Sequence, residues 1–157
     1  MASDEHDRLV DIGERWLRKN GFPVTYTELR SQGSREEPDI VGFNSKSSII
    51  IEVKVSRQDF IADKKKPERT SGGIGVYRFY MTPTGLLNVD EIPNGWGLLE
   101  VEKRKVHETV KPSGNLWPAL DCPEHLKKDW EYFQHVPDYN CERSALYSIA
   151  RRNYKNQ

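Results

Sequence analysis

Long apolar segments are missing from this sequence of 157 residues. A helix that crosses a bilayer needs about 20 consecutive apolar residues, and no stretch approaches that length. The N-terminus, Met-Ala-Ser-Asp-Glu-His-Asp, is too acidic and too polar for a secretory signal peptide. We therefore expect a cytoplasmic protein that has no membrane partner.

Cysteine is scarce, since Cys122 and Cys141 are the only two in the sequence. Two thiols are compatible with the reducing conditions of the cytoplasm. With His125 and His135 they could in principle bind zinc, because two thiols and two imidazoles suit that metal. The spacing matches no standard pair of short ligand turns, so ordinary packing is the favoured interpretation.

Net charge is also absent, because 24 basic residues balance 24 acidic ones. Proteins that bind nucleic acids often carry a basic excess, so this balance counts mildly against that class, although the distribution of charge matters more. No zinc finger or helix-turn-helix is visible, which favours recognition of shape or ends over sequence readout. The chain length fits one domain, and 36% hydrophobic with 31% charged residues is typical of a globular protein.

The segments that remain follow the order expected of an α/β protein. An apolar stripe predicts a first helix from Ser3 or Asp4 to about Lys19, which Asn20-Gly21 ends. A capping signal at Ser56 and Asp59 predicts a second helix that ends near Lys66. The predicted strands cover residues 24–29, 40–43, 49–55, 76–81 and 96–101, with an edge strand at 103–110. We expect residues 1–110 to form the core and 111–157 a helical extension on the same domain, closed by a helix at 143–154.

Two charges interrupt the most apolar of these strands, Ile49 to Val55. Glu52 and Lys54 point to the same face, because side chains alternate along a strand. Burying an ion costs several kcal/mol, so such a pair is seldom present for stability alone. A turn at residues 44–48 would make a hairpin that brings Asp39 beside Glu52. A buried ion pair, or a strand end that reaches solvent, is the structural alternative.

Pro38-Asp39 and Glu52-Val53-Lys54 together resemble the PD-(D/E)XK nuclease superfamily. The continuation from Ser56 to Pro67 also resembles the MmcB-type branch of small bacterial and phage proteins in that superfamily. The resemblance spans roughly Leu9 to Val101. It implies a restriction-endonuclease-like core in the order αβββαβ, with a central mixed β-sheet flanked by helices.

The resemblance also implies a function, namely hydrolysis of phosphodiester bonds in DNA during repair, recombination or the processing of phage or host DNA. Asp39 and Glu52 would hold Mg²⁺ or Mn²⁺ together with the backbone carbonyl of Val53, since oxygen ligands suit these ions. Lys54 would orient the attacking water and support the charge at phosphorus. Glu14 would join the metal site from the first helix, although a solvated acid is equally expected there.

A basic cluster follows the motif and is the expected contact to DNA phosphates. The cluster consists of Lys64, Lys65, Lys66 and Arg69, and Gln58 and the Gly72-Gly73 loop are further expected contacts by their position after the motif. Cations at the end of a helix also favour its dipole, so a solvated helix end is the alternative. Two further functions stay open, a catalytically silent module that binds DNA or a protein, and a nuclease acting on RNA. The sequence does not decide between a monomer and a homodimer.

Overall fold

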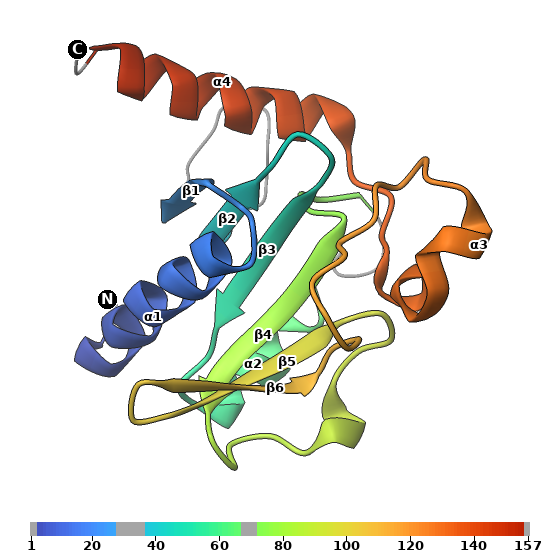
Figure 1. Cartoon of the computed structure of the whole chain (residues 1–157). Coiled ribbons are helices and arrows are strands. Elements are labelled where there is room, and N and C mark those ends of the chain that lie inside the picture. The colour runs from blue at the N-terminus through green and yellow to red at the C-terminus, as the bar shows by residue number, and fades with distance from the viewer. Residues whose placement is uncertain (1–2, 28–36, 67–71, 156–157) are drawn as a thin grey trace.

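A single mixed sheet of six strands organises the fold of the computed structural model, which describes residues 3–27, 37–66 and 72–155 (Figure 1). The strands stand side by side in sequence order, β1 to β6. The elements are α1 (Asp4–Lys19), β1 (Val24–Thr27), β2 (Ile40–Phe43), β3 (Ser48–Val53), α2 (Arg57–Asp63), β4 (Tyr77–Pro83), η2 (Val89–Glu91), β5 (Gly97–Glu102), β6 (Lys105–Val110), α3 (Glu124–Lys127), η3 (Lys128–Phe133) and α4 (Tyr139–Lys155).

The sheet combines parallel and antiparallel pairs. β1, β2 and β3 form an antiparallel meander, β3, β4 and β5 are parallel, and β6 returns antiparallel along the edge. The connection from β3 to β4 carries α2, as a parallel pair requires a crossover. The expected mixed α/β fold, a central mixed sheet flanked by helices, is present.

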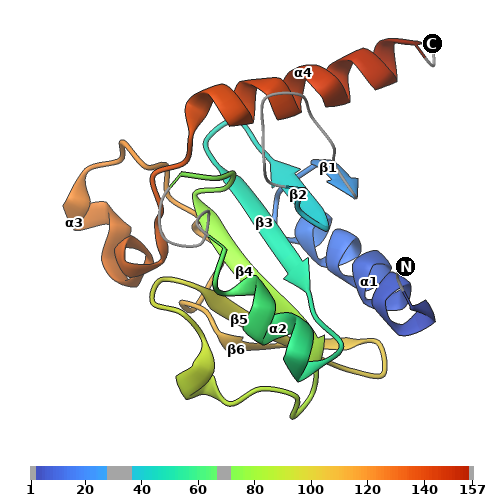
Figure 2. The same ribbon diagram turned by 180° about the vertical axis from the view of Figure 1, so that it is seen from behind.

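Helices cover both faces of this sheet, as the two opposite views show (Figures 1 and 2). α1 packs on one face, where Leu9 and Leu17 meet Ile51 of β3 in one buried cluster. α2 and α4 pack on the other, where Phe60 and Ile149 join a second cluster. The alternation of side chains along β3 therefore decides which residues face α1 and which face α2.

The two N-terminal caps expected from the sequence are present. The Ser3 hydroxyl accepts a hydrogen bond from the His6 N–H at 3.1 Å, and the Ser56 hydroxyl accepts one from the Asp59 N–H at 3.2 Å. The apolar face expected for α2 is only partly correct, because Phe60 is fully buried whereas Ile61 is 39% exposed. Asp63, three residues after Phe60, is buried in its place.

The central strand is shorter than expected, since β3 ends at Val53 and not at Val55. Lys54 still extends the ladder by one bond, because its N–H donates to the Met81 carbonyl at 2.9 Å. Lys54 is thus at the end of the strand rather than within it. Glu52, by contrast, is fully inside β3 and 4% exposed.

Residues after β6 are integral to both buried clusters. Trp117 and Trp130 join the cluster beneath α1, and Ala145 with Ile149 of α4 joins the cluster on the other face. The expected closing helix is confirmed and is longer, beginning at Tyr139. Within the described residues, no helix has the length and apolar character needed to cross a membrane.

Candidate active site

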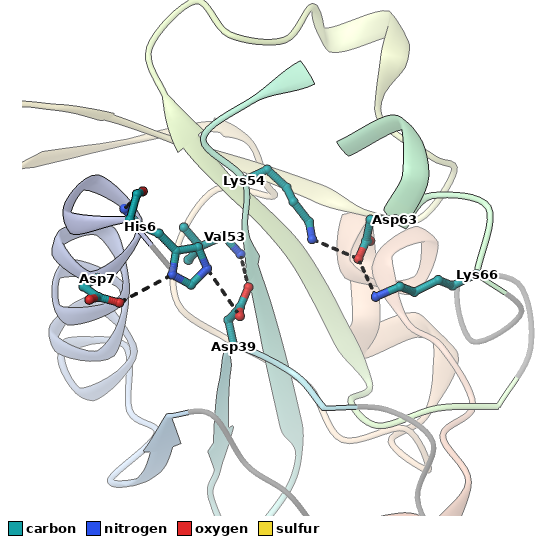
Figure 3. Close-up of polar contacts among 8 residues, drawn as sticks. His6, Asp7, Asp39, Val53, Lys54, Asp63 and Lys66 are labelled. Atoms are coloured by element: carbon teal, nitrogen blue, oxygen red, sulfur yellow. Dashed lines mark hydrogen bonds and ion pairs between the residues drawn. The ribbon is translucent and has the colours of Figure 1, made fainter. Parts of the chain in front are cut away.

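Asp39 lies just before β2, where it is bound from two sides (Figure 3). Its Oδ2 accepts a hydrogen bond from the Val53 N–H at 2.9 Å. Its Oδ1 lies 3.4 Å from Nε2 of His6, in the first turn of α1. The side chain is 21% exposed, so one surface of this carboxylate still meets solvent.

Glu52 neighbours this carboxylate through the register of the hairpin. The last paired residues of β2 and β3 are Ile40 and Ile51. Asp39 precedes Ile40 and Glu52 follows Ile51, so the same antiparallel register sets Asp39 opposite Glu52. Glu52 also lies beside Tyr80 in the parallel pairing of β3 with β4. Because Glu52 alternates with Ile51 and Val53, its side chain belongs to the face that α2 covers.

Lys54 points to α2 and not to Asp39 (Figure 3). Its Nζ lies 3.1 Å from Oδ1 of Asp63, which is 1% exposed. Lys66 reaches the same oxygen at 3.3 Å, and the Tyr80 hydroxyl donates to Oδ2 at 2.7 Å. A buried carboxylate that is paired and hydrogen-bonded in this way is well satisfied. The motif lysine is therefore held by a partner that the motif does not contain.

Glu14 binds other groups at a different place on α1. Its Oε2 accepts a hydrogen bond from the Thr25 hydroxyl at 3.0 Å and lies 3.4 Å from a guanidinium nitrogen of Arg18. The side chain of α1 that contacts Asp39 is instead His6, two turns nearer the N-terminus. Nδ1 of His6 is buried without a hydrogen-bond partner and lies 3.7 Å from Oδ1 of Asp7.

The donor atoms at this edge of the sheet are mainly oxygens. Among residues 3–27, 37–66 and 72–155, no three His, Cys, Asp or Glu side chains are grouped so that they could hold a metal ion. Two carboxylates and a backbone carbonyl form a smaller donor set, which Mg²⁺ tolerates because it usually retains several waters and binds through one or two carboxylates. Asp39, Glu52 and the Val53 carbonyl fit such an ion in chemical type.

The expected DNA contacts lie on and after α2. Gln58, Lys64 and Lys65 are exposed, whereas Lys66 is held by Asp63. The Lys64 ammonium lies 5.5 Å from the centre of the Phe60 ring. Arg69 is outside the described residues.

Arg57 anchors the start of α2 and so fixes where this surface lies. Its guanidinium forms an ion pair with Glu91 of η2 and donates a hydrogen bond to the Leu86 carbonyl at 3.2 Å. The hydrogen bond from Arg57 is the main reason that the pKa of Glu91 is lowered to about 2. The helix that carries Asp63 is thereby tied to the segment before β5.

The carbonyl groups of the glycine loop before β4 accept hydrogen bonds from a buried arginine of the same chain. Arg78 is 2% exposed, and its guanidinium donates to the Gly75 carbonyl at 2.9 Å and to the Gly72 carbonyl at 2.5 Å. These carbonyls compensate part of the cost of burying a guanidinium. The loop thus has a structural role beside the DNA contact expected of Gly72 and Gly73.

His6, Asp63 and Tyr80 are the site residues that sequence reasoning missed. Asp63 carried a usable signal, because it follows Phe60 by three positions and so shares its helical face. Tyr80 can be identified as a neighbour of the site only when the parallel pairing of β4 with β3 is known. His6 requires the placement of α1 over the end of β2, which no local pattern encodes.

The alternative zinc set does not come together in the described chain. The Gly95 carbonyl lies 2.8 Å from Nε2 of His135, and neither Cys122 nor Cys141 is in a disulfide within the described residues. Burial also lowers the pKa of His135 below its ordinary value.

Comparison with known proteins gives the fold and no activity. No family model matches the sequence, and no curated protein matches it. A solved structure of a protein of unknown function from Silicibacter pomeroyi is similar, with a TM-score of 0.65 and 19% identity over 99% of this chain and 90% of that one. At this identity the likeness shows the fold alone, a mixed α/β fold with a six-stranded sheet, flanking helices and a C-terminal helix.

Proposed function

We propose that this protein is a metal-dependent nuclease that hydrolyses phosphodiester bonds in DNA. The observation that carries the proposal is the hydrogen bond from the Val53 N–H to Asp39, at the step of the hairpin where Asp39 and Glu52 follow the last strand pair. The acid that precedes β2 therefore lies beside the Glu-Val-Lys sequence that ends β3.

The order of elements supports the same proposal at the level of the fold. The chain begins α1, β1, β2, β3, α2, β4, which agrees with the αβββαβ order of the restriction-endonuclease-like core. The Pro-Asp pair directly precedes β2, and the Glu-Val-Lys sequence runs over the end of β3, so both lie at one end of the antiparallel hairpin. The PD-(D/E)XK assignment rests on this agreement together with the sequence pattern.

Each residue has a role that its surroundings allow. Asp39 and Glu52 supply carboxylates, and Val53 supplies its carbonyl, to a Mg²⁺ or Mn²⁺ ion. When bound, such an ion provides charge neutralisation at phosphorus and activates water at neutral pH. Lys54, an ammonium held 3.1 Å from Asp63, orients the attacking water and faces the charge that develops. His6, beside Asp39, holds that carboxylate from the α1 side.

A second candidate function is a silent module of the same fold that binds DNA without cleaving it. The pairing of Lys54 with Asp63 favours this alternative, because it gives the lysine a structural partner. The two candidate functions differ in whether a divalent metal ion changes what the protein does to DNA. A nuclease needs the ion for turnover, whereas a binding module is indifferent to it.

The deciding experiment is a cleavage assay on duplex, single-stranded and branched DNA and on RNA. We expect Mg²⁺ or Mn²⁺ to support cleavage and Ca²⁺ to permit binding with little turnover, because Ca²⁺ tolerates longer and less regular coordination. Glu52→Gln should lower the rate by at least about 100-fold, since several kcal/mol of charge stabilisation is lost. Glu108→Gln, at an exposed position of β6, is the matched control and should keep full activity.

Equal cleavage in excess EDTA would contradict the proposed chemistry. Metal-dependent cleavage of RNA but not of DNA would support the metal site and would contradict DNA as the substrate. Binding of DNA that no divalent ion converts into product would favour the silent module. Glu14→Gln should leave the rate nearly unchanged if Glu14 serves only Thr25 and Arg18.

A further inference from the structure

A basic groove of about 410 Å³ lies between the second half of α1 and the β5–β6 hairpin. Its buried or half-buried floor is apolar, and its exposed rim carries four cations. The lining residues are Ile12, Trp16 and Val106 on the floor, and Arg15, Lys19, Arg104 and Lys105 on the rim. Among the residues that the structure describes, no acidic side chain lines this groove.

The rim cations differ from the other basic residues of α1. Arg8 pairs with Glu5 at 3.1 Å, and Arg18 lies 3.4 Å from Glu14. In the part of the chain that the structure describes, the four rim cations form no ion pair with an acidic side chain. A protein of zero formal net charge thus gathers four cations around one hollow. Such a site concentrates anionic ligands.

The groove is also preformed. Arg8 of α1 donates a hydrogen bond to the Lys103 carbonyl at the tip of the hairpin, at 2.5 Å. Trp16 belongs to the buried cluster beneath α1, and Val106 packs against that cluster. Both walls are therefore fixed by the core, so a ligand would not have to order them, which lowers the entropic cost of binding.

We propose that this basic groove binds the phosphate backbone of the nucleic acid on which the proposed nuclease acts. The inference rests on that proposed function and gives the substrate a second contact, separate from α2. α1 connects the two places, because His6 begins the helix at the candidate site and Lys19 ends it at the groove. Thirteen helical steps span about 20 Å, or roughly six base pairs of duplex.

The shape of the groove favours a backbone over an acidic protein segment. Ile12 and Trp16 are each 8% exposed, so the floor offers little apolar surface for an inserted side chain. Two of the four rim cations are arginines, whose planar guanidinium matches phosphate oxygens. A chain of phosphates that crosses between the two walls satisfies both features.

The test measures binding without cleavage, by fluorescence anisotropy of a labelled duplex of about 20 base pairs in EDTA, well over the roughly six that the helix spans. The groove variant carries Arg15→Gln, Lys19→Gln, Arg104→Gln and Lys105→Gln. The control variant carries the same loss of charge at exposed cations elsewhere, Lys46→Gln, Arg143→Gln, Arg151→Gln and Lys155→Gln. Circular dichroism melts of both variants verify that they fold.

The groove variant should bind at least about tenfold more weakly, with a salt dependence shallower by about 0.9 for each lost phosphate contact. The control variant should stay near the wild type. An equal loss in both variants, no loss in the groove variant, or no binding by the wild type would each overturn the proposal. Competition by polyglutamate as strong as that by DNA at equal charge would also overturn it, in favour of an acidic protein partner.

This result is independent of the outcome for catalysis. A wild type that binds through the groove but cleaves nothing with Mg²⁺ or Mn²⁺ would contradict the nuclease and support the groove. A wild type that cleaves, with a groove variant that binds normally, would contradict the groove alone.

Discussion

Asp39 is the residue through which a metal site and a structural ion pair can be separated. If Asp39 and Glu52 share a site, they repel each other when no metal is bound. Asp39→Asn keeps the shape and an acceptor for the Val53 N–H, so melting in EDTA should be unchanged or higher. Mg²⁺ should raise the melting temperature of the wild type, because it binds the folded form, and raise that of the variant much less.

Thermal melts of both proteins with EDTA and with Mg²⁺ measure this difference. All of these melts are recorded at one pH, so that titration elsewhere in the chain does not enter the comparison. A loss on the order of 3 to 5 kcal/mol in EDTA, with no response to metal in either protein, would show that Asp39 neutralises a buried cation.

Substitutions of Tyr80 and Lys54 measure how much the contacts of Asp63 contribute to the stability of the fold. Tyr80→Phe removes the donor that lies 2.7 Å from a buried carboxylate oxygen, and should lower the free energy of unfolding by about 1 to 3 kcal/mol. Lys54→Met should cost no more than this, because Lys66 still faces Asp63. It should nevertheless lower cleavage by at least about 100-fold if the ammonium acts at phosphorus.

Urea unfolding and cleavage rates, measured on the same preparations, separate the two roles of Lys54. Tyr132→Phe, at an exposed position, is the control for loss of a hydroxyl. A Lys54→Met protein that is strongly destabilised but cleaves at the rate of the wild type would assign the lysine to structure alone.

These residues also show what the sequence could and could not predict. Glu52 and Lys54 were accessible because charges in an apolar strand segment are locally unusual, and Asp39 was accessible because a hairpin would bring it beside Glu52. The pairing of Lys54 with Asp63 was not accessible, because it depends on how α2 crosses back over the sheet. Local patterns identify costly residues, but tertiary packing chooses their partners.

Among the elements, α4 is tied to the sheet by a half-buried acid. Glu142 accepts hydrogen bonds from the Ser48 hydroxyl at 2.5 Å and from the Gly75 N–H at 2.9 Å. Burial raises the pKa of Glu142, and these bonds and the charge of Arg78 offset only part of that effect. The folded protein therefore binds this proton more tightly than the unfolded chain.

This pKa shift predicts how stability depends on pH. A raised folded pKa gives stability that is fully present below the unfolded pKa and is lost as the pH rises through the folded pKa. Glu142→Gln keeps an acceptor and removes the titration. Melting temperatures between about pH 4 and pH 8, which spans the ordinary carboxyl pKa values, should shift in favour of the variant as the pH rises. Parallel curves for the variant and the wild type would contradict this, and Glu131→Gln at an exposed position is the control.

The helices were more predictable than the strands at this scale. Ser3 and Ser56 predicted the starts of α1 and α2, because a capping side chain binds the backbone of its own helical turn. The end of β3 was misjudged by two residues, since Lys54 and Val55 have strand composition but only Lys54 continues the ladder, by one bond. Strand ends depend on the neighbouring strand, here β4.

For the molecule as a whole, Trp117 makes the C-terminal third part of the core. Its ring lies 4.6 Å from Trp130, 5.1 Å from Tyr77 and 5.3 Å from Phe22, measured between ring centroids. Trp117→Ala should therefore lower the stability of the entire fold by about 3 to 5 kcal/mol in one cooperative transition. Leu116→Ala, at a 48% exposed neighbour, should change it little.

Calorimetry compares the two variants directly. Two separate transitions, of which only one shifts in Trp117→Ala, would mean that residues 111–157 fold as an independent unit. The sequence predicted a helical extension at residues 111–157, but it gave no sign that Trp117 would pack beneath α1.

The uneven placement of charge on a neutral molecule has a consequence for encounters with a polyanion. With no net charge, the protein feels little attraction beyond a Debye length, about 8 Å at physiological ionic strength. Inside that distance, the cations between α1 and the β5–β6 hairpin exert a torque that turns this side toward the polymer. Capture would then depend on rotation during contact rather than on long-range steering, so collisions on faces without such cations would end in release.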